Sequence, residues 1–219
     1  MINNIIFDFD GVLVDSEMLV AKSFSRYMNN LGYDFQEQNF AQFAGLKTFE
    51  VISILSKKFS IKDKKKFNED IMNIVTNIYL KELEPVKGAY KFVKNSKLNL
   101  FIGSNSVKKR ILQGLKKVKL DKYFKSDKVY SFDMVDKPKP FPDIYLKAIY
   151  DNNLKKNETL IIEDSSVGVK AGVSADVKVI GLTAGGHWYK ERNNIELFNA
   201  GAVEVIDNFD KLPYFIEKF

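Results

Sequence analysis

The stretch IIFDFDGVLVDSE, residues 5–17, decides the fold of this chain. It belongs to a mostly apolar run, residues 2–9, whose β-branched and aromatic residues are typical of a strand buried in a parallel sheet. The run carries Asp8, Asp10 follows it, and a third carboxylate stands at Asp15. Like charges beside a buried strand cost free energy unless a cation compensates them. The stretch therefore predicts a buried strand that leads into a charged site.

Strand and helix patterns alternate along the second part of the chain. Alternation of this kind predicts a parallel sheet with helices on both faces, which is an α/β, Rossmann-like core. The expected strands are residues 2–9, 98–103, 128–132, 159–163, 177–182 and 202–206, and the expected helices are residues 107–118, 144–150 and 167–175.

A block of purely helical patterns, residues 15–84, interrupts this alternation after the first strand. Pro85 marks the return to the α/β pattern. An insertion of this length predicts a separate α-helical cap domain. We therefore expect an α/β catalytic core, residues 1–14 and 85–219, with the cap between its two parts. The expected helices of the cap are residues 16–31, 48–59 and 63–83.

Composition narrows the class of protein. The sequence has no cysteine, which excludes disulfides and thiolate metal sites. Its formal net charge is +6, but the basic residues are scattered among acids and no nucleic-acid motif is present, so we expect no nucleic-acid partner. No apolar run approaches the roughly 18 residues of a membrane span, and no signal-peptide pattern begins the sequence. We expect a cytoplasmic protein with no membrane partner, acting as a monomer or weak dimer.

Polar side chains follow several of the expected strands. Ligand sites of open parallel sheets lie beyond the carboxyl ends of the strands, so these side chains are expected to meet at one edge. A lysine that precedes the helix of residues 144–150 is expected to join them. The candidates are Asp8, Asp10, Ser104, Asn105, Lys139, Glu163 and Asp164.

These residue types suit the transfer of a phosphoryl group. Clustered carboxylates need a cation, and hard oxygen ligands favour Mg²⁺, which prefers one or two carboxylates plus a substrate phosphate. A hydroxyl, a lysine and turn amides form a cradle for phosphate oxygens. A carboxylate beside that cradle can attack phosphorus and form an aspartyl-phosphate. The predicted metal site comprises Asp8, Asp10, Glu163 and Asp164.

Four motifs resemble those of the haloacid dehalogenase-like superfamily, specifically its phosphatases with a helical cap after the first motif. The cap segment FAGLKTFEVISIL, residues 43–55, is similar to that of sugar-phosphate phosphatases, including 6-phosphogluconate phosphatases. The resemblance implies a Mg²⁺-dependent phosphoric monoester hydrolase that acts on a small phosphorylated metabolite, a sugar or sugar-acid phosphate. The four motifs are FDFDGVLVDSE, GSNS, KPFPDIYLKA and IIEDSSVGVKAG, at residues 7–17, 103–106, 139–148 and 161–172.

The same resemblance implies a role for each candidate of the core. Asp8 is the expected nucleophile, and Asp10 the general acid and then base, whose backbone carbonyl also binds the metal. Ser104 and Lys139 are expected to hold the transferring phosphoryl group. Asp164 is expected to bind Mg²⁺ directly, with Glu163 either binding it or supporting the ligands.

Additional residues are candidates for contact with the substrate. Asn105 follows Ser104 in the second motif, and the cap contributes Glu17, Lys47 and Thr48. In the cap, a positive charge in the loop after Gly45 suits a second anionic group. The alternative, that these cap residues are ordinary surface residues, is left open.

The core candidates also have purely structural interpretations. Asp8 and Asp10 suit an Asx turn at a strand end, and Glu163 and Asp164 suit the start of a helix. A serine at 104 suits a helix cap, and both interpretations of it can hold, because Ser106 can cap the helix while Ser104 faces the phosphate.

Other residues compete for the same roles. Lys137 and Lys128 are alternatives to Lys139, which is preferred because it directly precedes the Pro-Phe-Pro-Asp that opens a helix. The only histidine, His187, stands in a loop and is expected to be exposed rather than catalytic.

Other activities remain as alternatives to a phosphatase. A β-phosphoglucomutase-like mutase shares the nucleophile, but those enzymes carry a histidine near the first cap helix where this chain has Val20. True dehalogenases need no metal and lack the second aspartate that stands here as Asp10. A signalling receiver also uses acids, a hydroxyl and a lysine, but the order of the motifs and the cap argue against it.

Overall fold

The computed structural model describes residues 1–43, 48–189 and 192–219 of the chain. The chain forms two compact units. The α/β unit comprises Met1–Asp15 and Glu84–Phe219, and the helical unit comprises Ser16–Leu83.

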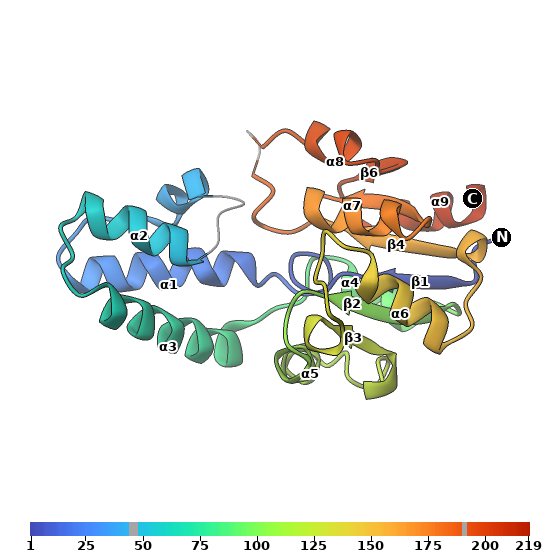
Figure 1. The fold of residues 1–219 in the computed structure, drawn as a ribbon, viewed down its shortest axis with the longest axis horizontal. Helices are drawn as coiled ribbons and strands as arrows, with labels where there is room; N and C mark the ends of the chain where they lie inside the picture. The colour runs from blue at the N-terminus through green and yellow to red at the C-terminus, as the bar shows by residue number, and fades with distance from the viewer. Residues whose placement is uncertain (44–47, 190–191) are drawn as a thin grey trace. The chain divides into compact units, whose positions relative to one another are not determined.

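A six-stranded parallel sheet is the centre of the α/β unit (Figure 1). Its strand order is β3-β2-β1-β4-β5-β6. From β1 the chain adds β2 and β3 on one side, and it then crosses to the other side of β1 and adds β4, β5 and β6. The prediction of an α/β, Rossmann-like parallel sheet is confirmed. The strands are β1 (Asn4–Phe7), β2 (Asn99–Ser104), β3 (Val129–Ser131), β4 (Thr159–Glu163), β5 (Lys178–Leu182) and β6 (Glu204–Ile206).

Strand β1 is buried on both faces, which explains why its sequence lacks an alternation of polar and apolar residues. Ile6 belongs to a core cluster with residues of α6 (Asp143–Asp151) and α7 (Ser166–Ser174). The neighbouring Phe7 points to the other face, since successive side chains of a strand alternate. Its ring lies 6.1 to 6.4 Å from the rings of Phe92, Phe124 and Phe209.

Three short helices of the α/β unit were not expected from the sequence. They are only seven, five and seven residues long, too short to show a repeated apolar face. Helices of this length are stabilised by packing and not by local propensity. They are α4 (Ala89–Asn95), α8 (Ile195–Asn199) and α9 (Leu212–Lys218), and the unit also contains the expected α5 (Lys108–Lys117).

The helical unit has its own aromatic core. Phe24 and Phe67 are fully buried in it, and the rings of Tyr27 and Phe67 stack with centroids 4.8 Å apart. Asp63 caps the longest helix by accepting a hydrogen bond from Lys66 N. Within the described residues, no helix combines the length and apolar character needed to cross a membrane. The helices are α1 (Glu17–Asn30), α2 (Thr48–Lys58) and α3 (Lys64–Glu82), with a 3-10 segment at Glu37–Phe43.

Candidate active site

A tight turn follows β1 and places its two aspartates. Gly11 has φ +79°, and its amide donates to the carbonyl of Val14 at 2.8 Å. The amides of Leu13 and Val14 both donate to Phe9 O, so the turn folds back on the strand end. Asp8 N donates to Ile162 O of β4 at 2.9 Å, which continues the pairing of the two strands beyond Phe7.

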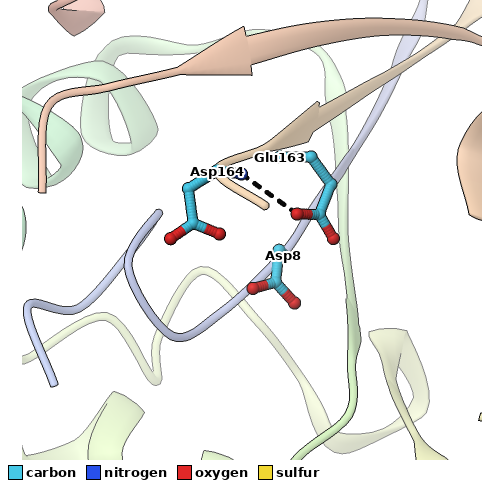
Figure 2. A group of neighbouring side chains, drawn as sticks. All are labelled: Asp8, Glu163 and Asp164. Atoms are coloured by element: carbon cyan, nitrogen blue, oxygen red, sulfur yellow. Dashed lines mark hydrogen bonds between the residues drawn. The ribbon is translucent and has the colours of Figure 1, made fainter. Parts of the chain in front are cut away.

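Three buried acids gather beyond the carboxyl ends of β1 and β4. Asp8, Glu163 and Asp164 each offer an oxygen, and these atoms all lie within 4.8 Å of one another. Figure 2 shows the three side chains pointing toward a common space. They meet because β1 and β4 are paired in parallel register, so that both strands end at the same edge. This is the point where the strand order reverses, which is where α/β sheets bind ligands.

Lys139 supplies a cation to this cluster. Its Nζ donates to Asp8 Oδ1 at 2.7 Å and to Glu163 Oε1 at 2.6 Å. Asn105 fixes the backbone of this lysine, because its Oδ1 accepts from Lys139 N at 2.9 Å and its Nδ2 donates to Lys139 O at 3.2 Å. Both polar atoms of the Asn105 amide are therefore used in positioning the lysine.

The two lysines that compete with Lys139 in the sequence lie over aromatic rings. Lys137 Nζ is 5.1 Å from the ring centroid of Phe141, and Lys128 Nζ is 4.7 Å from that of Phe101.

Glu163 accepts hydrogen bonds at both of its carboxylate oxygens. Its Oε1 accepts from Lys139 Nζ and from the Tyr145 hydroxyl at 2.8 Å. Its Oε2 accepts from Asp164 N, Ser165 N and Ser165 Oγ at 3.0 to 3.2 Å. A carboxylate has about four lone-pair sites, so these five donors saturate it. The arrangement suits a residue that holds Lys139 in place.

Helix α7 begins with a serine cap. Ser165 Oγ accepts from Gly168 N at 3.1 Å, which satisfies an amide of the first turn. Gly168 also lets the helix approach Glu163, since a Cβ there would lie 1.7 Å from Glu163 Oε1.

Burial changes the acidity of the cluster. It raises the pKa of Asp8 well above its usual range, an effect that the Lys139 charge opposes and that Glu163 and Asp164 reinforce. Burial and the Glu163 charge likewise raise the pKa of Asp164 well above its usual range. The three acids lie around one buried ammonium, so ionising all of them requires a further cation. Hard oxygen ligands with an excess of negative charge fit Mg²⁺.

Asp10 lies among donors from the segment after β2. Ser106 Oγ donates to Asp10 Oδ2 at 2.5 Å, and a guanidinium nitrogen of Arg110 lies 3.5 Å from Asp10 Oδ1. Ser104 is buried at the end of β2, and its Oγ accepts from Ser106 N at 3.1 Å. The expectation that Ser106 caps the following helix is wrong, because Val107 occupies the cap of α5 and the Ser106 hydroxyl is directed to Asp10.

The expectation that His187 is exposed is also wrong. Its Nε2 lies 2.9 Å from Asp164 Oδ2, and its side chain is only 15% exposed. The loop after β5 carries it back to the acid cluster, a long-range contact that no local pattern signals. Tyr145 and Arg110 were missed for the same reason, although Tyr145 stands within the motif KPFPDIYLKA.

The candidates of the helical unit remain predictions. Glu17 begins α1 and Thr48 begins α2, so both belong to a unit distinct from the one that holds the acid cluster. Lys47 lies outside the described residues.

Comparison with known proteins gives relatives over most of the chain. A phosphorylated carbohydrates phosphatase of Thermotoga maritima is 30% identical over 208 residues, which cover 92% of this chain and 93% of the relative. A 6-phosphogluconate phosphatase of Escherichia coli is 26% identical over 188 residues, 85% of each chain.

Solved structures resemble the whole chain as well. The structure of a putative β-phosphoglucomutase from Thermotoga maritima superposes with a TM-score of 0.82 at 26% identity and covers 99% of both chains. The family model described as haloacid dehalogenase-like hydrolase matches residues 5–182, which include most of β1, all of β2 through β5 and every acid of the cluster. The chain therefore belongs to the haloacid dehalogenase-like hydrolase family.

Proposed function

We propose that this chain is a Mg²⁺-dependent phosphatase that hydrolyses the phosphate monoester of a small sugar or sugar acid. The observation that carries the proposal is the Lys139 ammonium, which lies 2.7 Å from Asp8 and 2.6 Å from Glu163 in a buried cluster of acids. Phosphoryl transfer is mostly positioning and neutralisation of charge, and this arrangement supplies both. The names of the two relatives support a sugar-phosphate substrate.

The reaction takes place in two steps on Asp8. In the first, a carboxylate oxygen of Asp8 attacks phosphorus, the bond from phosphorus to the sugar oxygen breaks, and Asp10 gives its proton to the leaving oxygen. In the second, Asp10 takes a proton from water, whose oxygen bonds to phosphorus as the bond to Asp8 breaks. Inorganic phosphate leaves, and both aspartates return to their initial states.

The remaining core residues hold the reacting groups. The Ser104 hydroxyl accepts from Ser106 N, which leaves its proton to donate to a phosphoryl oxygen. Lys139 binds another phosphoryl oxygen, while Asn105 fixes its backbone and Glu163 its ammonium. The saturation of Glu163 by donors supports this role over direct binding of metal.

Asp8 and Asp164 are the residues that would hold Mg²⁺, together with the backbone carbonyl of Asp10. Their raised pKa values in a shared buried cluster support a site built for a cation. When bound, Mg²⁺ neutralises charge on these carboxylates and on the phosphoryl oxygens.

We assign substrate selection to the helical unit, acting as a cap on the catalytic α/β unit. Glu17, Lys47 and Thr48 are the proposed contacts of the cap with the sugar. A small change in such contacts shifts selectivity strongly, because an unpaired polar group in a pocket is costly.

Phosphate release tests the proposal. The purified chain is incubated with a panel of sugar phosphates and sugar-acid phosphates in Mg²⁺, and the Asp8→Asn variant and excess EDTA serve as comparisons. We expect phosphate from wild type alone, and only with Mg²⁺. Turnover that survives either Asp8→Asn or EDTA rejects the mechanism.

A mutase is the second candidate, supported by the likeness to the putative β-phosphoglucomutase structure. It would return the phosphoryl group to a sugar hydroxyl instead of to water. Product analysis with a hexose 1-phosphate and a bisphosphate activator separates the two, since a phosphatase releases inorganic phosphate and a mutase yields the 6-phosphate.

A further inference from the structure

Three successive residues of the loop that follows β5 contact either the segment after β1 or the acid cluster. Gly185 lies so close to the turn after β1 that a Cβ on it would come within 2.8 Å of Gly11 O. Gly186 N donates to both carboxylate oxygens of Asp15, at 3.2 and 3.1 Å. His187 Nε2 then lies 2.9 Å from Asp164 Oδ2. The loop is thus held both at Gly186 and at His187, the residue that contacts Asp164.

The Oδ2 atom of Asp164 lies against both His187 and the turn at Gly11. His187 Nε2 contacts it, and a Cβ built on Gly11 would lie 1.9 Å from it and 2.9 Å from a carbon of the His187 ring. Figure 2 shows one oxygen of Asp164 on the side of Asp8 and the other on the opposite side. Fixing one oxygen therefore fixes the direction in which the second one points.

We propose that His187 is a positioning residue for the metal site: it holds Asp164 Oδ2, so that the carboxylate presents its other oxygen to the divalent ion. This inference rests on the metal site of the proposed function. Groups that contact a ligating carboxylate restrict its rotation, and their loss typically weakens metal binding by about 10- to 100-fold. Asp15 supports the same arrangement indirectly, because it holds the residue before His187.

The chain carries its own reporter for this contact. Trp188 is the only tryptophan, and its ring centroid lies 5.9 Å from that of His187. A shift of His187 on binding of a metal at Asp164 changes the surroundings of the indole. The fluorescence of Trp188 is therefore expected to respond to Mg²⁺ in the wild type and to respond less in a variant without His187.

The test measures Mg²⁺ binding in the absence of substrate, by calorimetry and by Trp188 fluorescence. We expect His187→Ala to raise the Kd for Mg²⁺ by about 10- to 100-fold. His187→Gln, which keeps a donor nitrogen of similar reach, is expected to restore most of the affinity. Asn194→Ala is the matched control, because Asn194 is an exposed residue of the same β5–α8 connection and its side chain makes no capping bond.

Unchanged or tighter Mg²⁺ binding by a folded His187→Ala protein overturns the inference. If that variant does not fold, Asp15→Ala carries the test, because it removes the oxygens that accept from Gly186 N: weaker binding supports the inference and unchanged binding overturns it.

The design separates this inference from the proposed function. A wild type that binds Mg²⁺ in a His187-dependent way but hydrolyses no phosphate ester supports the inference and rejects the phosphatase. A wild type that binds no Mg²⁺ overturns both.

Discussion

The ammonium of Lys139 lies 2.7 Å from the carboxylate of Asp8, and the lysine side chain is only 3% exposed. Both charges have thus left water, which costs free energy that only close pairing and further hydrogen bonds offset. Glu163 completes the compensation from the other side of the ammonium. The lysine therefore stabilises the metal-free fold as well as serving the proposed reaction.

Replacement of Lys139 by alanine is expected to destabilise the protein by about 3–5 kcal/mol, because it leaves buried carboxylates without their cation. Urea denaturation at pH 7 in EDTA measures the loss, and phosphate release is expected to vanish with it. Lys137→Ala is the matched control, since Lys137 is exposed and lies over the Phe141 ring. Equal stability of Lys139→Ala and the control would show that the pairing of Lys139 with Asp8 and Glu163 contributes nothing to the stability of the fold.

The stability of the metal-free protein is expected to depend on pH through Asp8 and Asp164. Burial raises the pKa of both acids in the folded state, so the folded state retains protons that the unfolded state releases. Their contribution to stability is then present below about pH 4, the unfolded pKa, and is lost as pH rises through the raised values.

Mg²⁺ reverses this trend, because it binds the ionised acids of the folded state. The rise in Tm on addition of Mg²⁺ is expected to be larger at pH 8 than at pH 5, measured against EDTA at each pH. Asp164→Asn removes one of the two acids and serves as the comparison. If Mg²⁺ raises the Tm of wild type and of Asp164→Asn equally at pH 5 and at pH 8, the ionised acids do not bind the metal.

The central part of the site could be predicted because strand ends carry it. Asp8 and Glu163 each stand at the end of a short apolar run, and parallel pairing brings such ends to one edge. Lys139 was identifiable from the helix-opening prolines that follow it. These are local signals, and they needed only the rule that ligands bind beyond the carboxyl ends of parallel strands.

The supporting contacts could not be predicted because they join segments far apart in the sequence. Tyr145 reaches Glu163 and Ser106 reaches Asp10 through the packing of helices and turns on the sheet. His187 reaches Asp164 only because the loop after β5 folds back over the turn at Gly11. A hydroxyl or an imidazole in a loop gives no sign in the sequence of which partner it will meet.

Gly11 is expected to be required for the metal site. Alanine at this position suffers strain of about 1–2 kcal/mol at φ +79°, and its Cβ would lie 1.9 Å from Asp164 Oδ2. Since that distance is impossible, Asp164 has to move. Gly11→Ala should therefore bind Mg²⁺ more weakly than wild type in calorimetry, and more weakly than a variant that has only the backbone strain.

Gly32→Ala is the control for this prediction. Gly32 has a similar φ of +85°, but nothing lies within 4 Å of a Cβ built on it. This variant should lose a comparable amount of stability to strain and keep its affinity for Mg²⁺. Identical Mg²⁺ affinities for the two variants would mean that the approach of Asp164 to Gly11 does not matter.

Ser106 is expected to matter most for substrates with poor leaving groups. Its hydroxyl donates to Asp10, the proposed general acid, at 2.5 Å and so orients the carboxyl group. A sugar oxygen needs a proton to leave, whereas p-nitrophenolate leaves without one because p-nitrophenol is much more acidic than a sugar hydroxyl. Acid–base catalysis is worth about 10²–10⁴-fold, so even partial misplacement of Asp10 is measurable.

The measurement compares kcat for a sugar phosphate and for p-nitrophenyl phosphate in Ser106→Ala, Ser106→Thr and the exposed Ser126→Ala. We expect Ser106→Ala to lose about tenfold or more on the sugar phosphate and much less on the aryl ester. Ser106→Thr keeps the hydroxyl and should behave like wild type, as should Ser126→Ala. Equal losses on both substrates would assign Ser106 a merely structural role, because damage to the fold or to phosphate binding does not distinguish between leaving groups.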